Sequence, residues 1–162
     1  MTAYENEGYP VDRKGYNWHM SARPALTADV VVAGTSVWTL TKTGDIPSGA
    51  ILIEDATTAG RVNISKGAAA ELVVGVATVT RQGNDARPLT YTILGVVELV
   101  AGTGGVTKGD LLKADTVEAY WGAAITSADA GATVNGAKAT FGKALETALV
   151  GAKFMAYVNF MK

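Results

Sequence analysis

Short runs of β-branched and other apolar residues, each followed by a turn rich in glycine, recur from Asp29 almost to the end of the chain. The chain has 19 glycines in 162 residues, where an average usage of about 7% would give about 11. Closely spaced runs of this kind are typical of strands in an all-β domain, not of alternating strands and helices. We therefore predict a mostly β fold, a small β-barrel or sandwich of the β-tulip or SH3-like kind, with at most one or two short helices.

The predicted strands are bounded by Gly, Pro, Asn, Asp or Ser, the residues that favour turns. They cover residues 29–34, 36–41, 50–55, 61–64, 71–80, 89–102, 110–115, 117–125 and 152–160. The last is the clearest amphipathic strand, because every second residue from Phe154 to Phe160 is apolar on one face. Residues 144–150 are predicted to form a short helix and residues 126–138 a loop.

The first 28 residues show no period of two or of 3.6, and they are predicted to form an extended N-terminal arm before a β-rich domain at residues 29–162. Four of the chain's 12 aromatic residues lie in this arm among charged residues. A disordered terminus is the alternative reading, but the density of aromatics favours an arm that docks on a partner. The residues predicted to dock are Tyr4, Tyr9, Tyr16, Trp18, His19 and Arg23.

Two segments of the chain resemble each other. Residues 46–52 read Ile-Pro-Ser-Gly-Ala-Ile-Leu and residues 106–112 read Val-Thr-Lys-Gly-Asp-Leu-Leu. Each is followed by a second glycine in a run of small residues, at Gly75 and Gly142. Both a true internal repeat and a chance similarity of two turn–strand segments account for this pattern.

Charge and composition argue against several classes of partner. The net charge of −1 and the pI near 5.8 give no cationic surface for nucleic acid. No run of about 18 apolar residues is present to span a membrane, and the polar, acidic start does not resemble a signal peptide. The chain has no cysteine, so disulfides and thiolate sites are excluded.

Residues that could support catalysis do not form a recognisable site. His19 is the single histidine and falls in the arm, where no rigid shell would hold it against a nucleophile. The pairs Glu54/Asp55 and Asp110/Asp115 each point to opposite faces of a predicted strand, and Asp129 has no identifiable co-ligands. The glycine-rich residues 102–105 precede a strand, where a phosphate loop would precede a helix. We therefore expect no enzyme activity, no cofactor and no metal.

The order of four glycine-bearing segments is similar to that in the capsid decoration, or cement, proteins of tailed bacteriophages, which include the lambda-type head-decoration proteins. The segments are Val-Gly-Val-Ala at 74–77, Tyr-Thr-Ile-Leu-Gly-Val-Val-Glu-Leu at 91–99, Val-Thr-Lys-Gly-Asp-Leu-Leu at 106–112 and Phe-Gly-Lys-Ala-Leu-Glu at 141–146. The likeness extends over residues 45–160. The loop at 126–138 is longer than in lambda-type members.

This resemblance implies a non-enzymatic homotrimer that binds the major capsid protein on the outer surface of the virion. There it would stabilise contacts between capsid subunits, after assembly in the host cytoplasm. A carbohydrate- or ligand-binding β module is the alternative, with Trp38, Tyr120 and Trp121 as a stacking platform.

Overall fold

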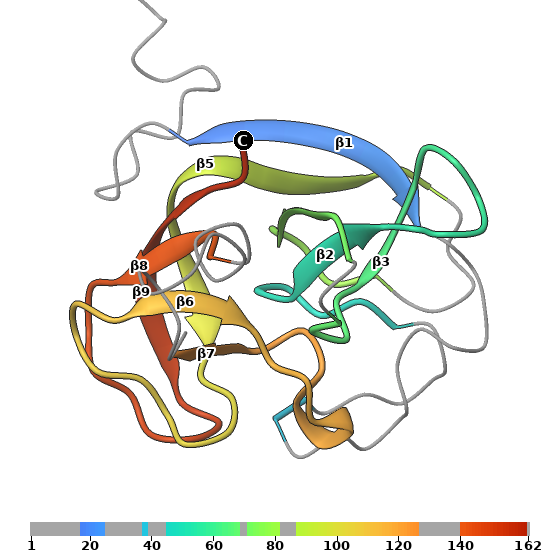
Figure 1. The fold of residues 1–162 in the computed structure, drawn as a ribbon. Coiled ribbons are helices and arrows are strands. Elements are labelled where there is room, and N and C mark those ends of the chain that lie inside the picture. The colour runs from blue at the N-terminus through green and yellow to red at the C-terminus, as the bar shows by residue number, and fades with distance from the viewer. Residues whose placement is uncertain are drawn as a thin grey trace, which may run out of the picture.

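The computed structural model describes residues 17–24, 37–38, 45–68, 71–81, 87–126 and 140–161 (Figure 1). The described residues contain nine strands and one 3₁₀ turn, which confirms the mostly β prediction. The elements are β1 (Trp18–Pro24), β2 (Ile51–Glu54), β3 (Arg61–Ile64), β4 (Val73–Ala77), β5 (Leu89–Val100), β6 (Leu111–Ala114), η2 (Glu118–Tyr120), β7 (Ala124–Thr126), β8 (Gly142–Ala144) and β9 (Lys153–Asn159).

Six of the predicted strands are confirmed in position, as β2, β3, β4, β5, β6 and β9. The alternation predicted for the last strand is also present, because Phe154, Ala156 and Val158 are buried while Lys153 and Tyr157 are exposed. The strand predicted at 29–34 lies outside the described residues. Only Val37 and Trp38 of the strand predicted at 36–41, and only Thr126 of the loop predicted at 126–138, are described.

The single strand predicted at 117–125 was wrong. The Asp115 carboxylate accepts a hydrogen bond from the Val117 N–H (2.9 Å) and turns the chain away from β6. The N–H groups of Tyr120 and Trp121 then bond to carbonyls three residues earlier, which makes the 3₁₀ turn η2. Strand β7 begins only at Ala124.

The helix predicted at 144–150 was also wrong. Its backbone N–H groups bond to other segments of the chain: Leu145 donates to the Met155 carbonyl of β9 and Ala148 to the Val106 carbonyl, each at 2.9 Å. A helix would need these donors for bonds four residues back along its own chain. Good helix-forming residues are here overridden by strand pairing.

Five strands close into a ring, which we call the first barrel. The order is β1–β3–β2–β4–β5, and β1 pairs with β5 as well as with β3. All of these contacts are antiparallel except the parallel pair β1–β3. In Figure 1, β1 arches over β5, with β2 and β3 beneath.

The remaining strands form a second barrel in the order β5–β9–β8–β6–β7. It closes through one parallel bridge between Ala101 and Ala124, where the Gly102 N–H donates to the Ala124 carbonyl (2.8 Å). The 12-residue strand β5 therefore belongs to both barrels: residues 89–94 pair with β1 and residues 94–100 with β9. Figure 1 shows it running between the two groups of strands.

Each barrel has its own apolar core. The first core gathers large side chains such as Trp38, Ile46, Leu52 and Tyr91. The second contains Leu112, Phe141, Phe154 and several alanines. Two residues of the first barrel, Ile51 and Val76, pack in the second core instead, so the two barrels share apolar contacts as well as a strand.

Residues 18–24, within the predicted arm, form β1 and are thus part of the wall of the first barrel. The sequence pattern did not show this strand, because Trp18, His19, Met20 and Ser21 are all exposed. A strand without a buried face has no alternation of apolar and polar residues to detect.

The structure decides between repeat and chance in favour of a repeat. Ile46 and Arg81 exchange both backbone hydrogen bonds, and Val106 and Ala148 do the same. The Gly49 N–H bonds to the Ala77 carbonyl (2.8 Å), as the Gly109 N–H bonds to the Ala144 carbonyl (2.9 Å).

The strand registers of the two barrels match as well. The pairs Ile51↔Val76 and Val76↔Thr92 of the first barrel correspond to Leu111↔Lys143 and Lys143↔Tyr157 of the second. The repeat therefore relates strands β2, β3, β4 and β5 of the first barrel to β6, β7, β8 and β9 of the second.

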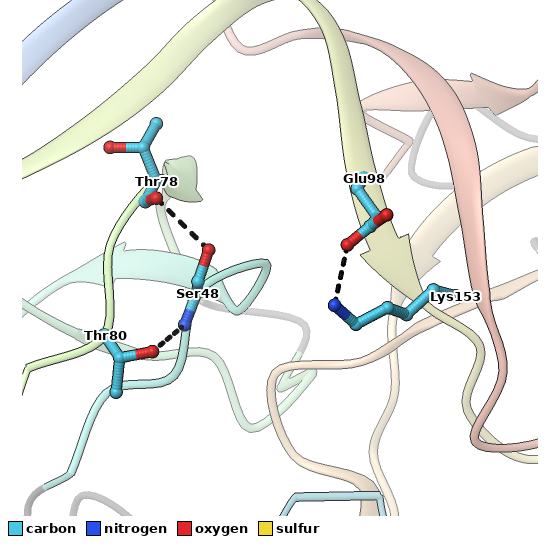
Figure 2. A network of polar contacts seen from close by, with 5 residues as sticks. All are labelled: Ser48, Thr78, Thr80, Glu98 and Lys153. Carbon is cyan, nitrogen blue, oxygen red and sulfur yellow. Dashed lines mark hydrogen bonds and ion pairs between the residues drawn. The ribbon is translucent and has the colours of Figure 1, made fainter.

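Side chains repeat too. In the first barrel, the Ser48 N–H donates to the Thr80 hydroxyl (3.1 Å), and Figure 2 shows the Ser48 hydroxyl also reaching the Thr78 carbonyl. In the second barrel the Lys108 N–H donates to the Thr147 hydroxyl (3.0 Å). The other contact in Figure 2, between Lys153 and Glu98, joins β9 to β5 at the surface, where an exposed ion pair adds little stability.

Gly67 offers a test of the contact between the barrels. Both Gly67 and Gly104 have positive φ, but a Cβ on Gly67 would lie 2.4 Å from the Asp115 carbonyl oxygen, whereas Gly104 faces open space. Gly104→Ala should cost about 1–2 kcal/mol for the left-handed backbone. Gly67→Ala should cost a further 1–3 kcal/mol, roughly, by forcing the barrels apart. Denaturant unfolding measures both, and equal losses would contradict the packing described.

Candidate docking surface

Strand β1 holds the described part of the region predicted to dock. Trp18 pairs with Leu94 and His19 with Thr92, with a register shift between the two pairs. Ile93 of β5 is the extra residue of this irregularity, so β1 keeps its alternation and Trp18 and Met20 point to the same face. Trp18 is 57% exposed and Met20 51%. We call the exposed side chains of Trp18, His19 and Met20 the β1 surface.

Asn17 fixes the start of β1. Its side-chain amide donates to the Val96 carbonyl (2.9 Å), and its Oδ1 accepts from the Val96 N–H (2.8 Å). These bonds lie beside Gly95, where a Cβ would be only 1.9 Å from the Asn17 Oδ1, so only glycine fits. A further hydrogen bond joins His19 Nδ1 and Thr92 Oγ1 (3.1 Å). The β1 surface is therefore anchored by side chains to the middle of β5.

The structure locates some of the predicted docking residues. Trp18 and His19 are adjacent residues of β1 and belong to the β1 surface. Arg23 lies in β1 opposite Arg61 of β3, but its side chain is outside the described residues. Tyr4, Tyr9 and Tyr16 also lie outside them, so their part in docking stays a prediction.

The aromatic platform of the carbohydrate-binding alternative is not present as an open surface. Trp38 is buried in the first core, and its indole N–H donates to the Trp121 carbonyl (2.8 Å). Trp121 packs against that core, with the Lys66 ammonium 4.6 Å from its ring centre. Trp38 and Trp121 thus join the first core to the loop before β7, and Tyr120 is half-buried.

The Asp55 carboxylate is held by hydrogen bonds within the turn that follows β2. Its Oδ1 accepts from the Thr57 N–H (3.0 Å), the Thr57 hydroxyl (2.7 Å) and the Thr58 N–H (2.7 Å), and its Oδ2 from the Asn63 amide (3.3 Å). Burial alone would raise the pKa of Asp55, but these hydrogen bonds favour the carboxylate and hold its pKa below the ordinary 3.8. The carboxylate thus closes the turn after β2.

Other polar groups are also engaged in structure. The Asp115 carboxylate accepts from the Thr103 N–H (2.7 Å) as well as from the Val117 N–H. Burial, with a smaller contribution from the Glu54 carboxylate, raises the pKa of the Tyr91 phenol, which therefore stays protonated at neutral pH. Among the residues the structure describes, no three metal-ligating side chains converge, and no helix is long and apolar enough to cross a membrane.

Comparison with known proteins shows a likeness of fold. No protein-family model and no curated protein sequence matches the chain. The fold is shared with a phage protein. A solved structure described as the head fiber gp8.5 N base in bacteriophage phi29 superposes with a TM-score of 0.57 at 15% identity, over 91% of this chain and 98% of that one. At this identity the likeness shows the fold alone.

The likeness extends over both barrels, because it covers nearly the whole of each chain.

The sequence did not reveal Asn17 and Met20 as functional candidates, since neither stands out in a region without periodicity. Nor did the sequence reveal that Leu111, Lys143 and Tyr157 are paired across β6, β8 and β9 and form a row of exposed side chains. Extending the internal similarity from residues 106–112 into β8 and β9 would have pointed to that row.

Asn17 provides a test of the β1 anchor. Asn17→Ala removes both bonds to Val96 and should lower the free energy of unfolding by about 1–3 kcal/mol. Asn17→Asp keeps an acceptor for the Val96 N–H but sets a carboxylate oxygen against the Val96 carbonyl, so it should not restore the stability lost in Asn17→Ala. Denaturant unfolding of the three proteins gives the order, and a harmless Asn17→Ala would contradict the anchoring role.

The Asp55 turn predicts a pH dependence. Because the folded-state pKa lies below the unfolded one, the carboxylate contributes its full stability above about pH 4–5 and loses it as pH falls through the folded pKa. The difference in unfolding free energy between wild type and Asp55→Ala should therefore be larger at about pH 7 than at about pH 2. Asp55→Asn, which keeps a side-chain oxygen, separates charge from turn geometry. A difference that does not change with pH would contradict this account.

Proposed function

We propose that this chain is a structural protein of a bacteriophage virion that binds the outside of the head through the major capsid protein and has no enzymatic activity. The observation behind the proposal is the shared fold with a phage head fiber base over 91% of the chain. The similarity of residues 45–160 to capsid decoration proteins supports the same assignment independently.

The β1 surface has the chemistry of a docking site. Aromatic and apolar side chains that become buried at an interface contribute most of its binding energy, and tryptophan is prominent among them. Trp18 and Met20 are exposed on a strand whose backbone is held rigidly against β5. Little conformational entropy would be lost on binding through such a strand. The aromatic residues before it extend the same predicted contact.

The resemblance to decoration proteins further leads us to propose that the bound form is a homotrimer that stabilises contacts between capsid subunits. Many identical weak contacts over a capsid lattice would gain avidity. The structural neighbour is described as a head fiber base, which suggests a contrasting role for this chain as the base of a further structure on the head. The two roles differ in whether the head itself becomes more stable.

Co-sedimentation with heads tests the binding. Heads purified from the phage that encodes the chain, prepared without this protein, should retain the wild-type chain on sedimentation. Trp18→Ala combined with Met20→Ala should weaken retention at least about tenfold, as expected for interface anchors. Leu72→Ala is the control, because Leu72 is comparably exposed on the approach to β4.

A truncation lacking residues 1–16 tests the aromatic arm, and it stops before Trp18 because removal of β1 would open the first barrel. Failure of the wild-type chain to bind heads would overturn the proposed function. Thermal disruption of decorated and bare heads tests the finer role: a higher disruption temperature supports cementing, and an unchanged one with full binding contradicts it.

A further inference from the structure

The internal repeat places one row of side chains in two different environments. In the first barrel, Ile51, Val76 and Thr92 are paired across β2, β4 and β5. Their exposed fractions are only 0%, 1% and 1%. Ile51 and Val76 contribute to the core of the second barrel. We call this row the covered face.

The equivalent row of the second barrel is open. Leu111, Lys143 and Tyr157 are paired in the same register across β6, β8 and β9. Leu111 is 40% exposed and Tyr157 44%, and Lys143 is also exposed. We call this row the open face. A strand face whose counterpart is fully buried is a candidate for a contact between molecules.

A loop of the second barrel forms hydrogen bonds with the backbone of the first barrel next to the covered face. Residues 115–123 run between β6 and β7, and within them Gly122 accepts a hydrogen bond from the Ile51 N–H and donates one to the Ser65 carbonyl, both at 2.9 Å. The Gly122 Cα approaches so closely that a Cβ would lie 2.8 Å from the Ile64 side chain. We call residues 115–123 the inserted loop.

The first barrel has an equivalent loop at residues 55–60, between β2 and β3. The Asp55 carboxylate accepts a hydrogen bond from the Thr57 N–H, and the Asp115 carboxylate accepts the equivalent bond from the Val117 N–H. The Asp55 N–H bonds to the Arg61 carbonyl and the Asp115 N–H to the Ala123 carbonyl. Gly60 and Gly122 both have positive φ, at +73° and +78°. Residues 56–60 are exposed, so we call residues 55–60 the free loop.

Each chain thus has one free loop and one open face, which are the equivalents of two surfaces already joined inside the molecule. We propose that the free loop of one copy docks beside the open face of a second copy, with Gly60 in the place that Gly122 takes beside Ile51. Charge fits this arrangement, because Glu54 next to the free loop is exposed, and so is Lys143 on the open face.

The contact between copies is weaker than the internal one. The free loop is shorter than the inserted loop and has no counterpart of Trp121, whose carbonyl accepts from Trp38 in the internal contact. Association therefore depends on concentration. It is also heterologous, because it joins two different surfaces, and it builds rings or open chains, not a two-fold dimer.

The first test is the mass in solution, measured by sedimentation equilibrium across a concentration series. The wild-type chain should form multiples of the monomer. Leu111→Glu, which places a charge in the contact and occupies Lys143 in place of Glu54 of the other copy, should raise the dissociation constant at least tenfold, roughly. Leu149→Glu is the matched control. Leu149 is 82% exposed at the start of the 149–152 turn and is not part of the row that forms the open face, so the dissociation constant should stay unchanged.

Three outcomes would overturn the proposal. They are a wild-type chain that stays monomeric up to millimolar concentration, an association that Leu111→Glu does not weaken, and an equal effect of Leu111→Glu and Leu149→Glu. The far-ultraviolet circular dichroism and unfolding midpoint of each variant show whether it is folded before its mass is interpreted.

Cross-linking tests the same contact without disrupting it. The chain has no cysteine, so Ala59→Cys and Leu111→Cys can be made in separate chains and mixed under oxidising conditions. A disulfide forms only where the Cα atoms come within about 7 Å. We expect a 59–111 dimer and no 59–149 dimer from the control mixture with Leu149→Cys. The absence of a 59–111 product at concentrations where the wild-type chain associates would overturn the proposal.

This inference specifies the surfaces of the self-association included in the proposed function, and it is tested without virus heads. A chain that associates through Leu111 but does not bind heads would sustain the inference and refute the proposed function. A chain that binds heads but stays monomeric in solution would refute the inference and leave the proposed binding to heads standing.

Discussion

Strand β5 is the element on which both barrels depend. Its N-terminal half pairs with β4 and β1, and its C-terminal half pairs with β9 and leads into the bridge that closes the second barrel. Because one backbone supplies hydrogen bonds to both rings, opening either barrel removes a wall of the other. Asn17 reinforces the crossing point by bonding both backbone groups of Val96. The two barrels are therefore expected to unfold together.

Duplication of one unit explains how the surfaces are distributed. The covered face of the first barrel is buried against the second, whereas its equivalent, with Leu111 and Tyr157, is exposed. The internal contact joins the loop of the second barrel to the face of the first. The loop of the first barrel and the face of the second therefore have no partner of this kind within the molecule. This asymmetry leaves exposed the two surfaces through which we propose that copies of the chain associate. It suits a protein proposed to act by position on a virus head.

The sequence was informative where an element has one buried face. The alternation of Phe154, Ala156 and Val158 predicted β9, and apolar runs bounded by turns predicted β2 to β6. It failed where tertiary bonds compete with local preference, as at residues 144–150, whose N–H groups bond to Met155 and Val106. It also failed at β1, where four consecutive exposed residues leave no pattern. Of the predicted docking residues, the described structure places Trp18, His19 and Arg23 in strand β1.

The fold class and the absence of cysteine chemistry were determined by the sequence alone, because turn spacing and strand periodicity are local properties of the chain. The repeat was visible as a few matching residues, but similar turn–strand segments also arise by chance. Only the tertiary structure decided it, through matching hydrogen bonds at Ile46 and Val106 and matching registers across β4 and β8. It also decided which copy of the repeated face is exposed. Burial depends on residues distant in sequence, such as Gly122 against Ile51, and no local pattern records such a contact.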